Sequence, residues 1–137
     1  MAVKRTPEQE EVVKNRGGAL LVSAAAGSGK TRVLVERLMD YILQEGRNID
    51  EFLIITFTRA AAEELRARIA KEIAEALAAQ PDHAHLRQQT VRLYETQIST
   101  IHAFCTVLLR QWGHLLDIPG DFALCEDEEA QVLMTRT

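Results

Sequence analysis

The chain alternates short apolar runs with longer segments in which apolar residues recur at helical spacing. Ala19–Ser23 and Phe52–Thr56 are continuous apolar runs of strand length, the pattern of parallel strands that are buried on both faces. Thr96–Thr100 fits a third strand. Helices are predicted at residues 8–15, 30–44, 59–79 and 86–94, and again from near His102. This alternation of strands and helices predicts an α/β fold.

Local signals support the predicted helix ends. Thr6 followed by Pro7 is typical of a helix start, and Gly46 is placed where a C-terminal cap is expected. The helix at 59–79 has an apolar stripe formed by Ala61, Leu65, Ile69, Ile73 and Leu77. Its opposite charges lie four residues apart, at Glu64/Arg68, Arg68/Glu72 and Lys71/Glu75. The charged side is therefore expected to face water.

Composition narrows the class of protein. With 137 residues, 47% of them apolar and 26% charged, the chain fits one globular domain. A net charge of −4 argues against a broadly basic nucleic-acid coat, so any DNA contact must be local. No apolar stretch reaches membrane-spanning length, and Cys105 and Cys125 follow no metal-ligand spacing; we expect a cytoplasmic protein without a structural disulfide. His83 and His85 are expected to be ordinary residues of a connector.

The strongest chemical signal lies between the first predicted strand and the next helix. The segment reads Ala24, Ala25, Ala26, Gly27, Ser28, Gly29, Lys30 and Thr31. Glycines let successive backbone amides face one anion, while Lys30 can reach the outer phosphates and the Thr31 hydroxyl can bind Mg²⁺. Ala24 stands where the usual phosphate-binding loop has glycine, so the turn there must tolerate a Cβ. The segment predicts binding of a nucleoside triphosphate.

Three further motifs accompany this loop. Thr6–Gln9 precedes it, Ile55–Leu65 follows the second predicted strand, and Ser99–Cys105 follows the third. Together with the Gly-Ser-Gly-Lys-Thr-Arg segment, these motifs resemble the first motor domain of superfamily 1 DNA helicases of the UvrD/Rep type, over roughly residues 6–110. The resemblance implies a P-loop NTPase with a partial RecA-like parallel sheet and flanking helices, which uses ATP and Mg²⁺ and acts on single-stranded and double-stranded DNA.

Within that group the loop and the acidic segment Asp127–Ala130 look most like the AddA subfamily, the helicase–nuclease subunits of bacterial AddAB recombination enzymes. This likeness implies a role in double-strand-break repair, exonuclease activity in the parent protein and a partner subunit of the AddB type. The chain then corresponds to the N-terminal part of the ATP-binding domain, residues 1–137, with the next subdomain starting at about residues 119–137. We expect such a fragment to bind ATP without completing hydrolysis.

The resemblance also assigns residues near the nucleotide. Gln9 matches the glutamine that reads the adenine edge, for which an amide offers both a donor and an acceptor. Arg32 matches a position next to the nucleotide. On the residues alone, Gln9 could equally be a solvent-facing helix residue and Arg32 a surface charge.

A second set of residues is implied to contact DNA. Phe57, Thr58 and Arg59 match a loop that contacts single-stranded DNA in the family, and the motif that includes Thr100, His102 and Phe104 lines the same track. Hydroxyls and guanidinium groups bind phosphates, and an exposed ring offers a stacking face to any base. For the aromatic residues and His102 the alternative is ordinary core packing.

One segment mimics the missing part of a complete ATPase. Phe122–Cys125 followed by Glu126 and Asp127 could pass for a strand that carries Mg²⁺-binding carboxylates. The acids instead favour the start of a helix, where they complement its dipole. The water-positioning acid and the arginine fingers are therefore expected outside this chain. A small nucleotide kinase and an ATP-gated DNA-binding module without motor activity are the alternative functions.

Overall fold

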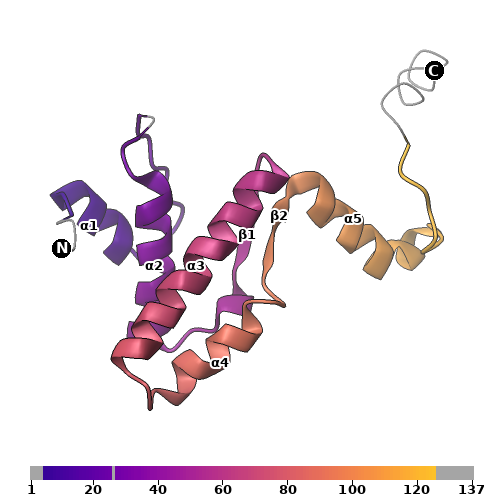
Figure 1. Cartoon of the computed structure of the whole chain (residues 1–137). Coiled ribbons are helices and arrows are strands. Elements are labelled where there is room, and N and C mark those ends of the chain that lie inside the picture. Colours follow the sequence, from indigo (N-terminus) through magenta and orange to yellow (C-terminus); the bar gives the residue numbers. More distant parts are fainter. Residues whose placement is uncertain (1–4, 26, 126–137) are drawn as a thin grey trace. The chain divides into compact units, whose positions relative to one another are not determined.

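A computed structural model describes residues 5–25 and 27–125 (Figure 1). It has an α/β structure in which two parallel strands are accompanied by helices. The chain divides into two compact units, residues 1–100 and 101–137. The elements of the first unit are α1 (Pro7–Lys14), α2 (Lys30–Glu45), the 3-10 turn η1 (Ile49–Glu51), β1 (Leu53–Thr56), α3 (Arg59–Ala79), α4 (Ala84–Arg92) and β2 (Gln97–Thr100). The second unit contains α5 (Ile101–Trp112) and the 3-10 turn η2 (Gly113–Leu116).

The predicted helices are confirmed, and their ends have local causes. Thr6 accepts a hydrogen bond from the Gln9 amide at the start of α1, and the Gln9 side chain completes a capping box. Gly46 ends α2 in the left-handed conformation with φ 66°. Thr58 accepts from the Ala61 amide at 3.1 Å and so caps α3.

Two of the three predicted strands form. β1 and β2 pair in parallel, with Leu53 opposite Gln97 and Thr56 opposite Thr100. Burial on both faces was a wrong expectation for the β1 run, because the side chains of Leu53 and Ile55 are exposed and only that of Ile54 is buried.

The prediction of a strand at Ala19–Ser23 is wrong for this structure. The segment has no regular secondary structure, and Leu21 is 95% exposed. A parallel strand needs hydrogen-bonded neighbours and covering helices, and the sheet of the described residues consists of β1 and β2 alone. The apolar pattern therefore has no partner to pair with.

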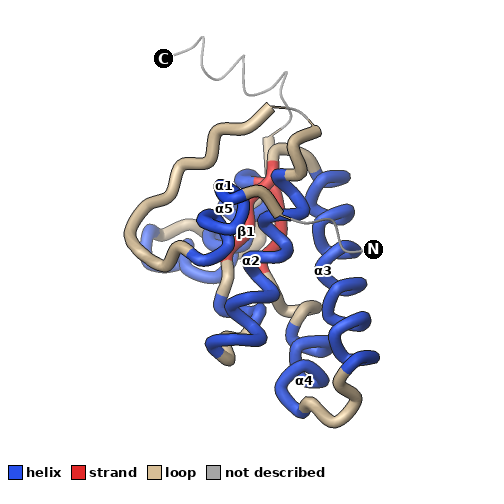
Figure 2. Tube along the Cα trace, turned by 90° about the vertical axis from the view of Figure 1, so that its left-hand side faces the viewer, coloured by secondary structure: helices blue, strands red, loops and turns tan. Residues whose placement is uncertain are grey.

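The core of the first unit lies where α2, α3, α4 and η1 meet the two strands. In both views α3 runs beside the strands (Figures 1 and 2). Its predicted stripe is confirmed at Leu65, Ile69 and Ile73, whereas Ala62 is buried in place of Ala61 and Leu77 is half-buried. The charged side of α3 carries the Glu64–Arg68 and Lys71–Glu75 ion pairs, as expected for a face in water.

The segment between α3 and β2 contains a buried amide. Gln89 is fully buried; its Oε1 accepts from the Ile49 amide at 2.8 Å and its Nε2 donates to Asn48 Oδ1 at 3.1 Å. His83 caps α4 by accepting from the Leu86 amide at 3.3 Å. His85 lies within α4 and not in the connector, which corrects its predicted position. The described residues contain no cluster of three histidine, cysteine or acidic side chains that could hold a metal.

In the second unit, α5 buries none of its side chains and η2 is followed by a turn in which Asp117 has φ 57°. The predicted chain break at residues 117–121 is therefore confirmed. Phe122–Cys125 forms no strand, while Glu126, Asp127 and the remaining acidic residues lie outside the described part of the chain. No helix among the described residues is long and apolar enough to cross a membrane.

Candidate functional site

The predicted phosphate-binding loop leads directly into α2. Gly27 and Gly29 have φ values of 77° and 86°, a region that favours glycine because it has no Cβ. Gly29 is the N-cap of α2 and offers no side chain, so the first amides of the helix have no side-chain acceptor from this residue. A helix start of this kind favours an anion. Ala26, which was also predicted to belong to the loop, lies outside the described residues.

Lys30 and Thr31 occupy the first turn of α2 and are both exposed. The Lys30 Nζ donates to the carbonyl oxygens of Ala24 and Ala25, at 2.6 and 2.7 Å. The ammonium group is thus folded back over the loop, where phosphate oxygens would compete with these two carbonyls for it. Among the described residues the Thr31 hydroxyl has no hydrogen-bond partner, so its oxygen can serve as a ligand.

A hydroxyl oxygen at this position fits Mg²⁺, which prefers oxygen ligands and takes most of the others from phosphates and water. No carboxylate of the described residues contacts Lys30 or Thr31. The donor set therefore suits a metal that arrives with a nucleotide and does not form a protein cage of its own.

The α1 helix meets the loop through Gln9. Its Nε2 donates to the Ser28 carbonyl at 3.2 Å, and its Oε1 accepts from the Thr6 amide at 3.1 Å and from Arg32 Nη2 at 3.2 Å. The structure thus brings Gln9 and Arg32 together at the loop, and both are half-buried. The alternatives of a solvent-facing glutamine and an unengaged surface arginine are excluded.

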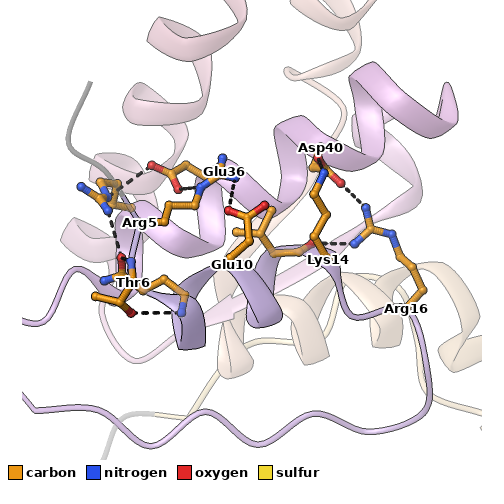
Figure 3. A network of polar contacts seen from close by, with 10 residues as sticks. Arg5, Thr6, Glu10, Lys14, Arg16, Glu36 and Asp40 are labelled. Carbon is orange, nitrogen blue, oxygen red and sulfur yellow. Dashed lines mark hydrogen bonds and ion pairs between the residues drawn. The ribbon is translucent and has the colours of Figure 1, made fainter. Parts of the chain in front are cut away.

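Sequence reasoning missed the polar network that holds α1 against α2 (Figure 3). At one end, Glu36 accepts from Arg5 Nε at 2.6 Å and pairs with Arg32 Nε at 3.2 Å, and Arg5 also bonds Glu10 at 2.9 Å. Hydrogen bonds to Glu10 and Glu36 raise the pKa of the Arg5 guanidinium. Arg5 and Glu36 are 31 residues apart, so no local pattern could indicate this pair.

At the other end of the network, Asp40 accepts from Lys14 at 2.8 Å and from Arg16. Burial raises the pKa of Asp40, but the hydrogen bonds from Lys14 and Arg16 outweigh this effect and leave the pKa below its ordinary value. Arg16 also pairs with Glu45 and lies 4.0 Å from the centre of the Tyr41 ring. These contacts fix α1 on α2 and thereby place Gln9 at the loop.

The predicted DNA-contacting residues of the first unit gather at one edge of the sheet. Phe57 directly follows β1 and its ring is fully exposed, which excludes core packing for it. Arg59 is exposed at the start of α3, and the Thr58 hydroxyl is engaged as the cap of that helix. Thr100 ends β2 opposite Thr56, so both strand ends lie at the same edge. Open parallel sheets bind ligands at this edge.

The remaining two predicted DNA contacts belong to the second unit. His102 is exposed and Phe104 is half-buried, and both lie in the first turn of α5. The His102 carbonyl accepts from Thr106 Oγ1 at 2.8 Å. Partial burial leaves both interpretations of Phe104, stacking platform and packed ring, as predictions.

Comparison with known proteins gives a consistent family. The model of the UvrD/REP helicase N-terminal domain matches residues 5–137. The chain is also similar to bacterial proteins that are named as AddA-type subunits of an ATP-dependent helicase/nuclease. It is 47% identical to that of Lachnoclostridium phytofermentans over 130 residues, which is 93% of this chain and 9% of the relative. It is 44% identical to that of Oceanobacillus iheyensis and 41% identical to that of Staphylococcus saprophyticus, in each case over 96% of this chain and 11% of the relative. The chain thus spans about a tenth of the length of these relatives.

Proposed function

The chain belongs to the UvrD/REP helicase N-terminal domain family, as its motifs predicted, and on this premise we propose that it is the nucleotide-binding part of an ATP-dependent DNA helicase motor. ATP with Mg²⁺ binds the loop at residues 24–31. DNA binds the edge of the sheet at Phe57, Arg59 and Thr100 and, in the second unit, His102 and Phe104. The fold is that of a P-loop NTPase with part of a RecA-like sheet. The relatives' name and length support this interpretation.

The observation that carries the proposal is the meeting of Gln9, Ser28 and Arg32 at a helix start with two left-handed glycines. The amides around Gly27 and Gly29 bind phosphate oxygens, and Lys30 exchanges the Ala24 and Ala25 carbonyls for the outer phosphates. Gln9 is placed to orient the base, since one N–H of its amide remains after the bond to Ser28.

Bound through Thr31, Mg²⁺ would neutralise charge on the outer phosphates. The proposal assigns binding to these residues and not hydrolysis, because no described carboxylate contacts Lys30 or Thr31. The water-positioning acid and the arginine fingers belong to other parts of the parent protein. For that parent we propose unwinding and translocation on DNA in double-strand-break repair, with a nuclease activity and an AddB-type partner subunit.

Binding of a fluorescent ATP analogue in the presence of Mg²⁺ tests the nucleotide site. Lys30→Ala should weaken binding at least tenfold, because a charge-assisted contact to phosphate contributes about 1.5–3 kcal/mol. Lys71→Ala is the matched control, since Lys71 is an exposed lysine paired only with Glu75. Equal affinities of the Lys30→Ala variant and the unaltered protein would contradict the proposed site.

A further inference from the structure

Arg66 of α3 reaches across to the segment that leads into β2. Its Nη1 donates to the Leu93 carbonyl at 2.5 Å, and its Nη2 donates to the carbonyls of Thr96 and Ile98 at 3.0 and 3.4 Å. Leu93 is the C-cap of α4 and Ile98 belongs to β2. One side chain therefore ties three elements together, α3, α4 and β2.

The acceptors of Arg66 are all backbone carbonyls. Among the ion pairs of residues 5–25 and 27–125 none involves Arg66, so its charge is satisfied by these dipoles and by the C-terminal end of α4. A guanidinium presents several N–H groups in a rigid plane, which suits acceptors that are spread over six residues of chain. A lysine has the same charge but is a single point of donation. The arrangement thus depends on the shape of arginine and not only on its charge.

The position of Arg66 connects the two sides of the proposed DNA edge. The α3 helix begins at Arg59, immediately after Phe57 and Thr58. β2 ends at Thr100, opposite Thr56. Arg66 lies seven residues after Arg59 on the same helix, about 10 Å along the helix axis. A phosphate bound at Arg59 is therefore too far away for Arg66 to share it, while the β2 segment that Arg66 holds leads directly to Thr100.

We propose that Arg66 is a positioning residue for DNA binding: it holds the end of β2 beside the start of α3, so that Phe57, Arg59 and Thr100 form one contact surface. This inference rests on the proposed function. It predicts that the contact surface loses affinity when the carbonyls of Leu93, Thr96 and Ile98 are no longer held together, even though the contacting side chains are intact.

The test compares Arg66→Lys with Arg68→Lys in the full-length protein. Arg68 is the matched control because it lies on the same helix but is exposed and bonded to Glu64. Binding of a fluorescein-labelled oligothymidylate is measured by anisotropy over a range of salt concentrations, together with binding of the fluorescent ATP analogue. Arg66→Lys should weaken DNA binding about threefold to tenfold, as expected for the loss of one or two hydrogen bonds. The salt dependence and ATP affinity should be unchanged, and Arg68→Lys should bind DNA normally.

A double-mutant cycle with Arg59→Ala separates positioning from an independent effect. If Arg66 acts through the surface that contains Arg59, its substitution should cost less in the Arg59→Ala background. Multiplicative losses would overturn the inference, as would a salt slope lowered by about one, which marks a direct phosphate contact. Unchanged DNA affinity in Arg66→Lys would overturn it while leaving the proposed function standing, provided that Arg59→Ala weakens binding. Absence of DNA binding by the unaltered protein would overturn both.

A further measurement needs no substitution and so does not depend on a variant that folds. Amide hydrogen exchange of the unaltered protein is followed with and without the oligothymidylate. Binding should slow exchange at residues 57–62 and 97–100 together, because Arg66 links the two segments. Slower exchange in only one of them would contradict a shared contact surface.

Discussion

Replacing Gln9 by alanine tests whether the contact between α1 and the loop contributes to nucleotide binding. The substitution removes three hydrogen bonds, to the Ser28 carbonyl, the Thr6 amide and Arg32, at 3.1–3.2 Å. Each bond contributes about 0.5–1.5 kcal/mol when well formed, and Gln9 is only half-buried, so the values near the lower limit apply. The expected loss in the free energy of unfolding is about 1–2 kcal/mol, which includes the capping box of α1.

The effect on nucleotide affinity has two separable parts. Without the bond to Ser28 the loop is less ordered before binding, which should weaken ATP and inorganic tripolyphosphate alike, about fivefold for about 1 kcal/mol. If the amide also reads the base, ATP should lose a further factor of about ten that tripolyphosphate does not lose.

Calorimetric titration with ATP and with tripolyphosphate, both with Mg²⁺, measures the two parts. Gln44→Ala is the control, since Gln44 is an exposed glutamine at the far end of α2. An equal loss for the two ligands would limit Gln9 to ordering the loop. A lower melting temperature with unchanged affinity for both ligands would refute the reasoning, because the contact with Ser28 would then be irrelevant to the site.

Two further predictions concern the contacts on either side of the core. The ion pairs of Asp40 with Lys14 and Arg16 lower its pKa, so their stabilisation is present at neutral pH and is lost as the pH falls from about 4 through that lowered value; urea unfolding at pH 7 and pH 3 should show it, and Asp40→Asn should remove that part of the pH dependence. Phe57→Ala should weaken binding of single-stranded DNA by about 1–3 kcal/mol through lost stacking, without lowering the melting temperature, because the ring is fully exposed; a fall in melting temperature with unchanged DNA affinity would contradict it.

Helices could be predicted closely because their causes are local. The bounds expected for α3 agree with the structure, since Thr58 caps it, the buried side chains recur at helical spacing and its charges pair four residues apart. The strand expected at Ala19–Ser23 fails for the opposite reason. An apolar run becomes a strand only when another strand pairs with it, and that partner cannot be read from the run itself.

The candidate site divides in the same way. The glycine positions predicted a loop with left-handed backbone, and Gly27 and Gly29 have that conformation. The approach of Gln9 to Ser28 was implied by family resemblance and not by spacing, because the two residues are 19 positions apart. Arg66 gave no signal at all, since its acceptors are carbonyls, which every residue carries. Contacts between side chains and distant backbone groups require the packed structure.

The two proposed binding regions share one core, and this determines which experiments can separate them. The α2 helix begins at the phosphate-binding loop and packs on α3, which begins at the proposed DNA edge. Ile42 of α2 and Ile69 of α3 belong to the same buried cluster and are almost completely inaccessible to solvent. Truncating either one would disturb both helices, because a cavity in a close-packed core shifts its neighbours. A loss of ATP and DNA binding together would then report the shared packing and not coupling between the sites. Substitutions of Lys30 and Phe57, whose side chains are exposed, leave this core intact and so report each region by itself.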